Sequence, residues 1–388
     1  MSYQSRGNST QRLAVVLILI FFIASLTGCG GVKQTSDKLL ENRAQNQDSG
    51  GHTGEFLGSI TDGKLVPVEL PEGSAMLYCQ WSPDGQWLAY SSDGDIFLYN
   101  SATGQHHNLT STPDRWELMP SWSPDGSMLC FTSRPLYGRE GQPSPTGHEV
   151  MAGAWGGCPT VINLDGTGYN ILEAGLVTNP GWSADGKKVV YGCQGSIHLF
   201  NLEDRTARVI TAKEIDLQSR YIGSPSWSPT RSEIAFFFYN DDRETTRQEA
   251  IEENVVTTEQ GYALLDLQTS EVRILYAYES RYINRPPALW NADGSKLIFN
   301  MKPEGYVYSP EGIMLTNRQG GKVENIGTAY QVVWAPDGKQ LAYMVASDYQ
   351  VVKMVTFTKD TYNSQTIANK TGLIEGIAWR PAPKRQNE

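Results

Sequence analysis

The sequence has 388 residues, a formal net charge of −10 and no dense run of Lys or Arg. Such an acidic chain disfavours nucleic acids and anionic lipid surfaces as partners, because both carry negative charge. We therefore expect no nucleic-acid partner. Frequent Gly and Pro, together with 19 Tyr and 10 Trp, are typical of a fold made of many short strands and turns.

The first 28 residues have the pattern of a signal peptide. Arg6 and Arg12 precede an apolar run over 13–25, which is shorter than the ~20 residues that cross a bilayer. The run leads into Leu26-Thr-Gly-Cys29, which resembles the lipobox of bacterial lipoproteins. The resemblance implies that the chain is cleaved before Cys29 and that a diacylglycerol is attached to this residue. Each buried CH₂ contributes about 0.8 kcal/mol, so two or three acyl chains anchor a protein stably.

Residues 29–53 are polar and have no sustained apolar period, which predicts a flexible tether behind the lipidated Cys29. We expect the protein in the cell envelope, lipid-anchored on the extracytoplasmic side. If the cell is Gram-negative, the sorting rule of bacterial lipoproteins favours the outer membrane, because Gly30 rather than Asp follows Cys29. Otherwise the location is the outer face of the plasma membrane.

From residue 54 to residue 388 the sequence repeats a Trp followed by a turn. In Trp81-Ser-Pro-Asp-Gly85, the order Ser, Pro, Asp, Gly favours a type I turn. The Trp residues recur at spacings of 41, 60, 45, 63, 44 and 45 residues. Four spacings fit the roughly 40–45 residues of a four-stranded blade, and the two longer ones imply insertions. The repeated residues are Trp81, Trp122, Trp182, Trp227, Trp290, Trp334 and Trp379.

Short apolar runs after each turn predict four antiparallel strands per repeat, which is the construction of a propeller blade. The last copy supplies a first strand near 374–379, and the segments 54–60 and 64–70 resemble a third and a fourth strand. We therefore expect an all-β fold, a β-propeller of four-stranded blades closed by its N- and C-terminal strands. We expect seven blades, with six as the alternative.

These units resemble the PD40 repeat, a WD40-like repeat of the Tol type. The same repeat forms the propellers of the Tol periplasmic protein, of prolyl-oligopeptidase-type peptidases and of many lipoproteins of unknown role. The resemblance therefore implies the fold and leaves the function open. In the fourth copy Thr230-Arg231 replaces Asp-Gly, so we expect that hairpin to be altered locally. We interpret the repeated Trp residues as structural residues between blades rather than as a sugar-binding platform.

Four cysteines remain besides the lipidated Cys29. Cys158 and Cys193 are expected on loops of one propeller face, and disulfides form outside the cytoplasm. The sequence leaves open a Cys158–Cys193 bridge or four buried free thiols. The positions of Cys79 and Cys130 inside expected strands favour free thiols for these two residues.

Two insertions, Arg134–Gly157 and Tyr239–Gly261, fall between the second and third strands of their repeats. Loops from equivalent positions emerge on one face, and long loops on a rigid scaffold commonly carry binding sites. We therefore expect a monomeric scaffold that binds an envelope protein or a glycan on this face.

Motifs for catalysis and metal binding are missing from the sequence. It has five His, no H-E-x-x-H, no Cys/His set with zinc spacing, no G-x-S-x-G and no nucleotide-binding glycine motif. We therefore predict no catalytic residue, cofactor or metal. An extracytoplasmic hydrolase or lyase acting on carbohydrate or peptide is the alternative, because some propellers are lyases or cyclases with His, Glu and metal along the axis.

Overall fold

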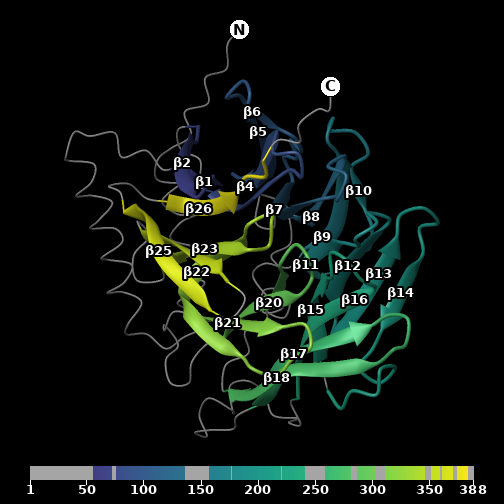
Figure 1. The fold of residues 1–388 in the computed structure, drawn as a ribbon. Coiled ribbons are helices and arrows are strands. Elements are labelled where there is room, and N and C mark those ends of the chain that lie inside the picture. The colour runs from purple at the N-terminus through teal and green to yellow at the C-terminus, as the bar shows by residue number, and fades with distance from the viewer. Residues whose placement is uncertain are drawn as a thin grey trace, which may run out of the picture. The chain divides into compact units, whose positions relative to one another are not determined.

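The structure is a computed structural model, and the regular elements that it describes are β-strands (Figure 1). The described residues are 56–71, 76–135, 157–175, 177–219, 221–240, 258–280, 286–301, 311–345, 351–358, 361–369 and 374–382. They belong to a unit that spans Gly54–Glu388. Within these ranges, no helix is long and apolar enough to cross a bilayer.

Four sheets contain four strands each, and every pairing within them is antiparallel. The first comprises β3 (Met76–Trp81), β4 (Trp87–Ser92), β5 (Asp95–Asn100) and β6 (His106–Asn108). The second comprises β7 (Arg115–Trp122), β8 (Met128–Pro135), β9 (Cys158–Asn163) and β10 (Asn170–Ile171). The third comprises β11 (Val177–Trp182), β12 (Lys188–Cys193), β13 (Ser196–Asn201) and β14 (Ala207–Ile210). The fourth comprises β15 (Tyr221–Trp227), β16 (Glu233–Tyr239), β17 (Thr258–Asp266) and β18 (Val272–Ser280).

A fifth sheet has seven strands, because one long strand takes part in two repeats. Its strands are β19 (Leu289–Trp290), β20 (Lys296–Met301), β21 (Glu311–Asn317), β22 (Glu324–Trp334), β23 (Gln340–Val345), β24 (Val351–Phe357) and β25 (Tyr362–Asn369). The first half of β22 pairs with β21, and its second half pairs with β23. The strand thus joins the repeat of Trp290 to the repeat of Trp334 without a break.

The last sheet joins the two ends of the described chain. It contains β1 (Phe56–Thr61), β2 (Lys64–Glu69) and β26 (Ile374–Trp379). Figure 1 shows β26 in yellow beside β1 and β2 in purple. β1 pairs with β26 in parallel. In an antiparallel blade the first and third strands run in the same direction, so this parallel pairing follows when the second strand is missing.

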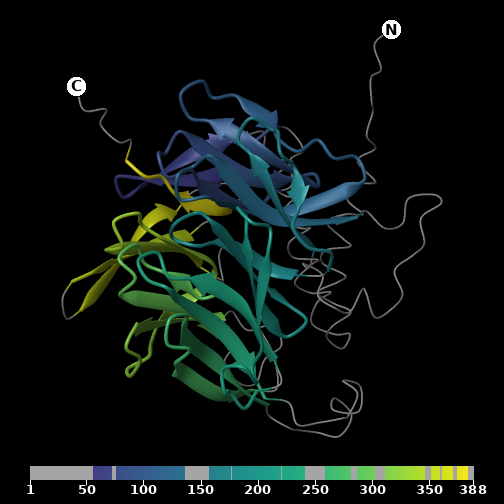
Figure 2. The same ribbon diagram turned by 90° about the vertical axis from the view of Figure 1, so that its right-hand side faces the viewer.

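The hydrophobic core lies between neighbouring sheets. One cluster combines Val190 and Ile197 of the third sheet with Ile222 and Phe236 of the fourth, all completely buried. Figure 2 shows the teal strands of the third sheet next to the green strands of the fourth. Strands covered on both faces are apolar almost throughout, as in the run Ile234–Phe238. The all-β propeller with joined ends is confirmed, whereas the number of blades stays a prediction.

A shared hydrogen-bond network fixes the turn after the Trp in three repeats. In the first of these, Ser82 Oγ donates to Asp84 Oδ1 at 2.6 Å and accepts from the backbone N–H of Trp87. The equivalent bonds recur after Trp122 and Trp182. Gly85 adopts a φ of 69°, a conformation in which glycine avoids the steric cost of a Cβ. The Ser-Pro-Asp-Gly pattern therefore specifies the hairpin between the first and second strands.

Candidate functional site

Each repeat Trp stands at or next to the end of a first strand, and four of them tie neighbouring repeats together. In each of these four, the indole Nε1 donates to a backbone carbonyl in the preceding repeat. The acceptor is the residue immediately before that repeat's own Trp. These bonds are Trp122 to Gln80 (2.9 Å), Trp182 to Ser121 (2.9 Å), Trp290 to Ser226 (3.1 Å) and Trp334 to Leu289 (3.1 Å). Most buried indole N–H groups in proteins have such a partner, and the bond fixes the ring between two repeats.

Trp227 departs from this pattern. By the same rule its indole would donate to Gly181, but Nε1 donates to Arg231 O within its own turn, at 3.2 Å. The cause is the Thr230-Arg231 replacement, which removes the Asp that accepts the Ser hydroxyl in other copies. Ser228 Oγ is buried and has no hydrogen-bond partner among the described residues. The expected local change in the fourth hairpin is therefore confirmed. The Trp227 ring is partly exposed, as are the rings of Trp290 and Trp334, which keep the inter-repeat bond.

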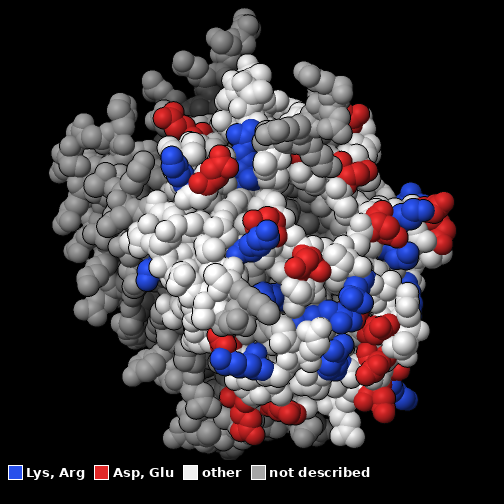
Figure 3. Space-filling model, viewed as in Figure 1, with Lys and Arg blue, Asp and Glu red and all other residues white. Residues whose placement is uncertain are grey.

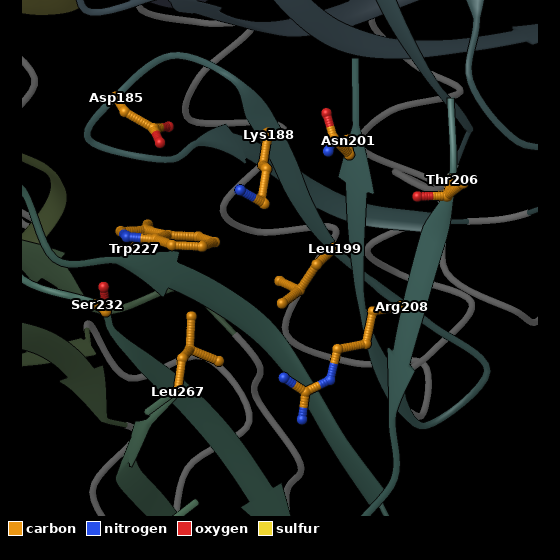
Figure 4. Close-up of a pocket in the computed structure, with 9 residues that line it drawn as sticks. All are labelled: Asp185, Lys188, Leu199, Asn201, Thr206, Arg208, Trp227, Ser232 and Leu267. Carbon is orange, nitrogen blue, oxygen red and sulfur yellow. The ribbon is translucent and has the colours of Figure 1, made fainter. Parts of the chain in front are cut away.

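The turned Trp227 ring forms one wall of a pocket between the third and fourth sheets. The pocket has a volume of about 310 Å³ and is open to solvent. Its lining residues are Asp185, Lys188, Leu199, Asn201, Thr206, Arg208, Trp227, Ser232 and Leu267. Figure 4 shows them around an open centre, with the Trp227 indole and the Arg208 guanidinium on different sides. We call this site the Trp227 pocket.

Charged groups of opposite sign lie close together in and beside the Trp227 pocket. Arg208 Nη2 lies 3.0 Å from Glu214 Oε1, and both side chains are about half exposed. The pKa of Asp185 is lowered, first by the Ser183 hydroxyl and then by the backbone N–H of Lys187, with a further contribution from the charge of Lys188. The Asp185 carboxylate is therefore ionised at neutral pH. Acidic and basic groups are also interspersed over the face that Figure 3 shows.

The pocket lies at the strand ends opposite to those from which the two long insertions leave. Asp185 belongs to the turn between the first and second strands of its sheet, whereas the insertions join second and third strands. Most of both insertions, 136–156 and 241–257, lies outside the described residues. The expectation that the binding face is the insertion face therefore stays a prediction, and the Trp227 pocket is a different candidate.

The cysteines are placed as follows. Cys29 lies outside the described residues. Cys79, Cys130, Cys158 and Cys193 are free thiols, so the structure contains no Cys158–Cys193 bridge. The two nevertheless lie in neighbouring sheets, at the start of β9 and the end of β12, and Cys158 is among the groups that raise the pKa of Cys193. Oxidation of the pair stays a prediction.

Comparison with known proteins gives partial matches in sequence. The model of the dipeptidyl peptidase IV N-terminal region matches residues 51–134. Dipeptidyl-peptidase 5 of Porphyromonas gingivalis is 33% identical over 101 residues, which are 21% of this chain and 15% of that protein. A probable dipeptidyl peptidase 4 of Aspergillus fumigatus is 26% identical over 91 residues, 20% of this chain and 12% of that protein. The matches thus span a small part of these relatives.

Solved structures resemble the chain over a larger share of its length. An oligogalacturonate lyase in complex with manganese has a TM-score of 0.52 and 14% identity, covering 73% of this chain and 76% of its own. A chain of the mitotic checkpoint complex has a TM-score of 0.51 and 12% identity, covering 78% and 83%. At such low identity the likeness concerns the fold alone. Sequence and structure together identify the described chain as a β-propeller.

Proposed function

We propose that the protein is a lipid-anchored binding scaffold on the extracytoplasmic side of the cell envelope, and that the Trp227 pocket holds a sugar residue of a glycan. The observation that carries the proposal is the Trp227 indole, which leaves the inter-repeat bonding pattern and lines a pocket instead. Trp122 and Trp182 are almost completely buried, and Trp290 and Trp334 are partly exposed like Trp227, but Trp227 is the repeat Trp that lines the pocket.

The chemistry of the pocket favours an uncharged, hydroxyl-rich ligand. Trp227, Leu199 and Leu267 offer apolar surface to the C–H face of a sugar ring. Asn201 and Thr206, together with the charged groups, supply donors and acceptors for hydroxyls. The paired charges do not favour a ligand with a large net charge. A volume of about 310 Å³ lies at the lower end of the range for small-molecule sites, about 300–1,000 Å³.

Calorimetric titration of the full-length chain in detergent tests this proposal. The probes are oligosaccharides of neutral hexoses and of N-acetylhexosamines, with uronate oligosaccharides as the charged comparison. We expect a neutral probe to bind, and Trp227→Ala to weaken it at least about tenfold, equivalent to about 1.4 kcal/mol. Trp182→Phe, the matched control at the equivalent position of the neighbouring third sheet, should lower stability and leave affinity unchanged. Binding that survives Trp227→Ala, or no binding by the unaltered chain, contradicts the proposal.

The lipid anchor has its own test. Cells expressing the chain are labelled with radioactive palmitate and separated into soluble and membrane fractions. The unaltered chain should carry label and fractionate with membranes, whereas Cys29→Ala should lose the label. Equal labelling of both chains would remove Cys29 as the acceptor without touching the pocket.

A hydrolase or lyase acting on carbohydrate or peptide is the second candidate. The match to the dipeptidyl peptidase family over residues 51–134 favours it. Incubation of the full-length chain with the same oligosaccharides and with short peptides, followed by mass spectrometry, separates the two functions. Product formation by the unaltered chain would replace the scaffold proposal.

A further inference from the structure

Three side chains with different metal-binding atoms meet at the other end of the third sheet, away from the Trp227 pocket. One ligand atom from each of Glu173, Cys193 and His198 lies within 4.8 Å of the other two. His198 Nδ1 is 2.9 Å from Glu173 Oε2. Cys193 is 6% exposed and the His198 side chain 10%, while the Glu173 side chain is 33% exposed. We call these three residues the Glu173 cluster.

The backbone brings the start of β9, with Cys158, beside the loop that carries Glu173. The loop that carries Glu173 is held to the start of β9 at two points, by Leu172 N–H to Pro159 O at 2.8 Å and Val177 N–H to Gly157 O at 2.9 Å. Cys158 lies between these two acceptors. Val177 also pairs with Cys193 across β11 and β12. The chain therefore places the two cysteines on either side of one strand end.

Gly175 gives the loop a backbone conformation that favours glycine beside Cys193. Its φ is 148°, which L side chains rarely adopt, and a Cβ there would lie 3.5 Å from Cys193 Sγ. On the sheet itself, Tyr191 is the direct cross-strand partner of His198. The Tyr191 hydroxyl donates to Glu173 Oε2 at 2.5 Å. One carboxylate oxygen is thus oriented by a buried tyrosine while it faces the histidine.

We propose that the Glu173 cluster binds a divalent zinc ion, with Glu173, Cys193 and His198 as the three protein ligands and the fourth position left to a water molecule. Zinc takes sulfur, imidazole nitrogen and carboxylate oxygen in tetrahedral sites, with nitrogen and oxygen at about 2.0–2.1 Å. Two such atoms around one zinc are about 3.3 Å apart, from that bond length and the tetrahedral angle. The 2.9 Å separation of His198 Nδ1 and Glu173 Oε2 needs only a small adjustment.

Tyr191 completes the arrangement as a positioning residue. A hydrogen bond to a metal-binding carboxylate fixes its orientation, and such outer partners strengthen metal sites. Cysteine binds zinc as the thiolate, so zinc binding forms one Zn–S bond to Cys193 and releases its thiol proton to solvent, with no change of oxidation state. This site is independent of the proposed glycan pocket, because the two share no residue.

Sequence spacing does not reveal this site. Glu173 comes from a loop, and Cys193 and His198 come from two neighbouring strands. The ligand intervals match none of the compact zinc motifs, so the prediction that no metal is bound rested on spacing alone. The signal lies in the three-dimensional pairing of the strands.

The test uses the full-length chain in detergent, reduced, stripped of metal and titrated with Zn²⁺ against a chromophoric chelator. Co²⁺ then replaces Zn²⁺, because a thiolate–cobalt charge-transfer band reports sulfur ligation directly. We expect one ion per chain and a thiolate band. Cys193→Ser should abolish the band, and His198→Gln and Glu173→Gln should weaken Zn²⁺ binding at least tenfold.

Cys79→Ser is the matched control, because Cys79 is a partly buried thiol in a strand of another sheet. It should leave the stoichiometry, the affinity and the cobalt spectrum unchanged. Circular dichroism of each metal-free variant separates lost ligation from lost folding, and Glu173→Gln changes only one partly exposed group. Absence of Zn²⁺ binding by the reduced chain, or a cobalt band that persists in Cys193→Ser, overturns the proposal.

Discussion

The indole hydrogen bonds between repeats predict that the same Trp→Phe substitution lowers stability at Trp182 and leaves it nearly unchanged at Trp81. Trp182 Nε1 donates to Ser121 O at 2.9 Å, whereas Trp81 Nε1 is buried and has no hydrogen-bond partner among the described residues. Phe keeps an aromatic ring in place and removes the N–H in both cases. The comparison therefore isolates the contribution of the bond.

The magnitudes follow from the two environments. Trp182→Phe removes a bond with a net value of about 0.5–1.5 kcal/mol and reduces packing by about 1 kcal/mol, so we expect a loss of about 2 kcal/mol. Trp81→Phe has the same packing cost, but it also removes an unsatisfied buried donor, which relieves about 1–3 kcal/mol. The Arg380 guanidinium, 4.8 Å from the Trp81 ring, can still stack on Phe. We therefore expect Trp81→Phe to lie within about 1 kcal/mol of the unaltered protein.

Urea unfolding followed by circular dichroism measures both variants, and an unchanged slope shows that the difference is one of stability. Trp182→Phe should shift the midpoint clearly downward and Trp81→Phe should not. Equal losses in the two variants would refute the role given to the inter-repeat bonds.

Two further predictions concern buried charges. Arg318 pairs with Glu233 across two sheets, with Nε donating to Oε2 at 2.5 Å. Arg318→Ala leaves the buried Glu233 carboxylate unpaired, so it should lower the free energy of unfolding in urea by about 3–5 kcal/mol. A stability equal to that of the unaltered chain contradicts this prediction. Burial raises the pKa of Glu117, so its ionised form opposes folding above the ordinary value of 4.5. Glu117→Gln should raise Tm at pH 7, and the gain should disappear below pH 4.5; a lower Tm at pH 7 counts against it.

The repeat pattern was sufficient to predict the fold, because each Ser-Pro-Asp-Gly turn is a local signal that fixes a hairpin. The closing sheet was also predictable, since the C-terminal Trp379 segment resembles a first strand and the segment after Gly54 lacks one. The parallel pairing of β1 with β26 is the consequence of the missing second strand. The continuous β22 was not predictable, because nothing in the run 324–334 indicates that one strand passes between two repeats.

The sites were less accessible to sequence reasoning. Thr230-Arg231 was recognised as a departure, but its effect on the direction of the Trp227 indole depends on hydrogen bonds that only the folded chain forms. The Glu173 cluster depends on the pairing of Tyr191 with His198 and on a loop held by two backbone bonds. Neither relation is encoded in the intervals between Glu, Cys and His.

The most direct test of the central claim is ¹⁹F NMR of the chain labelled with 5-fluorotryptophan, whose ten Trp residues each supply one resonance. Trp227→Phe identifies the Trp227 signal, and Trp182→Phe identifies a structural one. Addition of the neutral oligosaccharide that binds in calorimetry should shift the Trp227 signal and leave the Trp182 signal in place. A ligand that shifts other Trp signals and leaves Trp227 unchanged would contradict the assignment of the binding site.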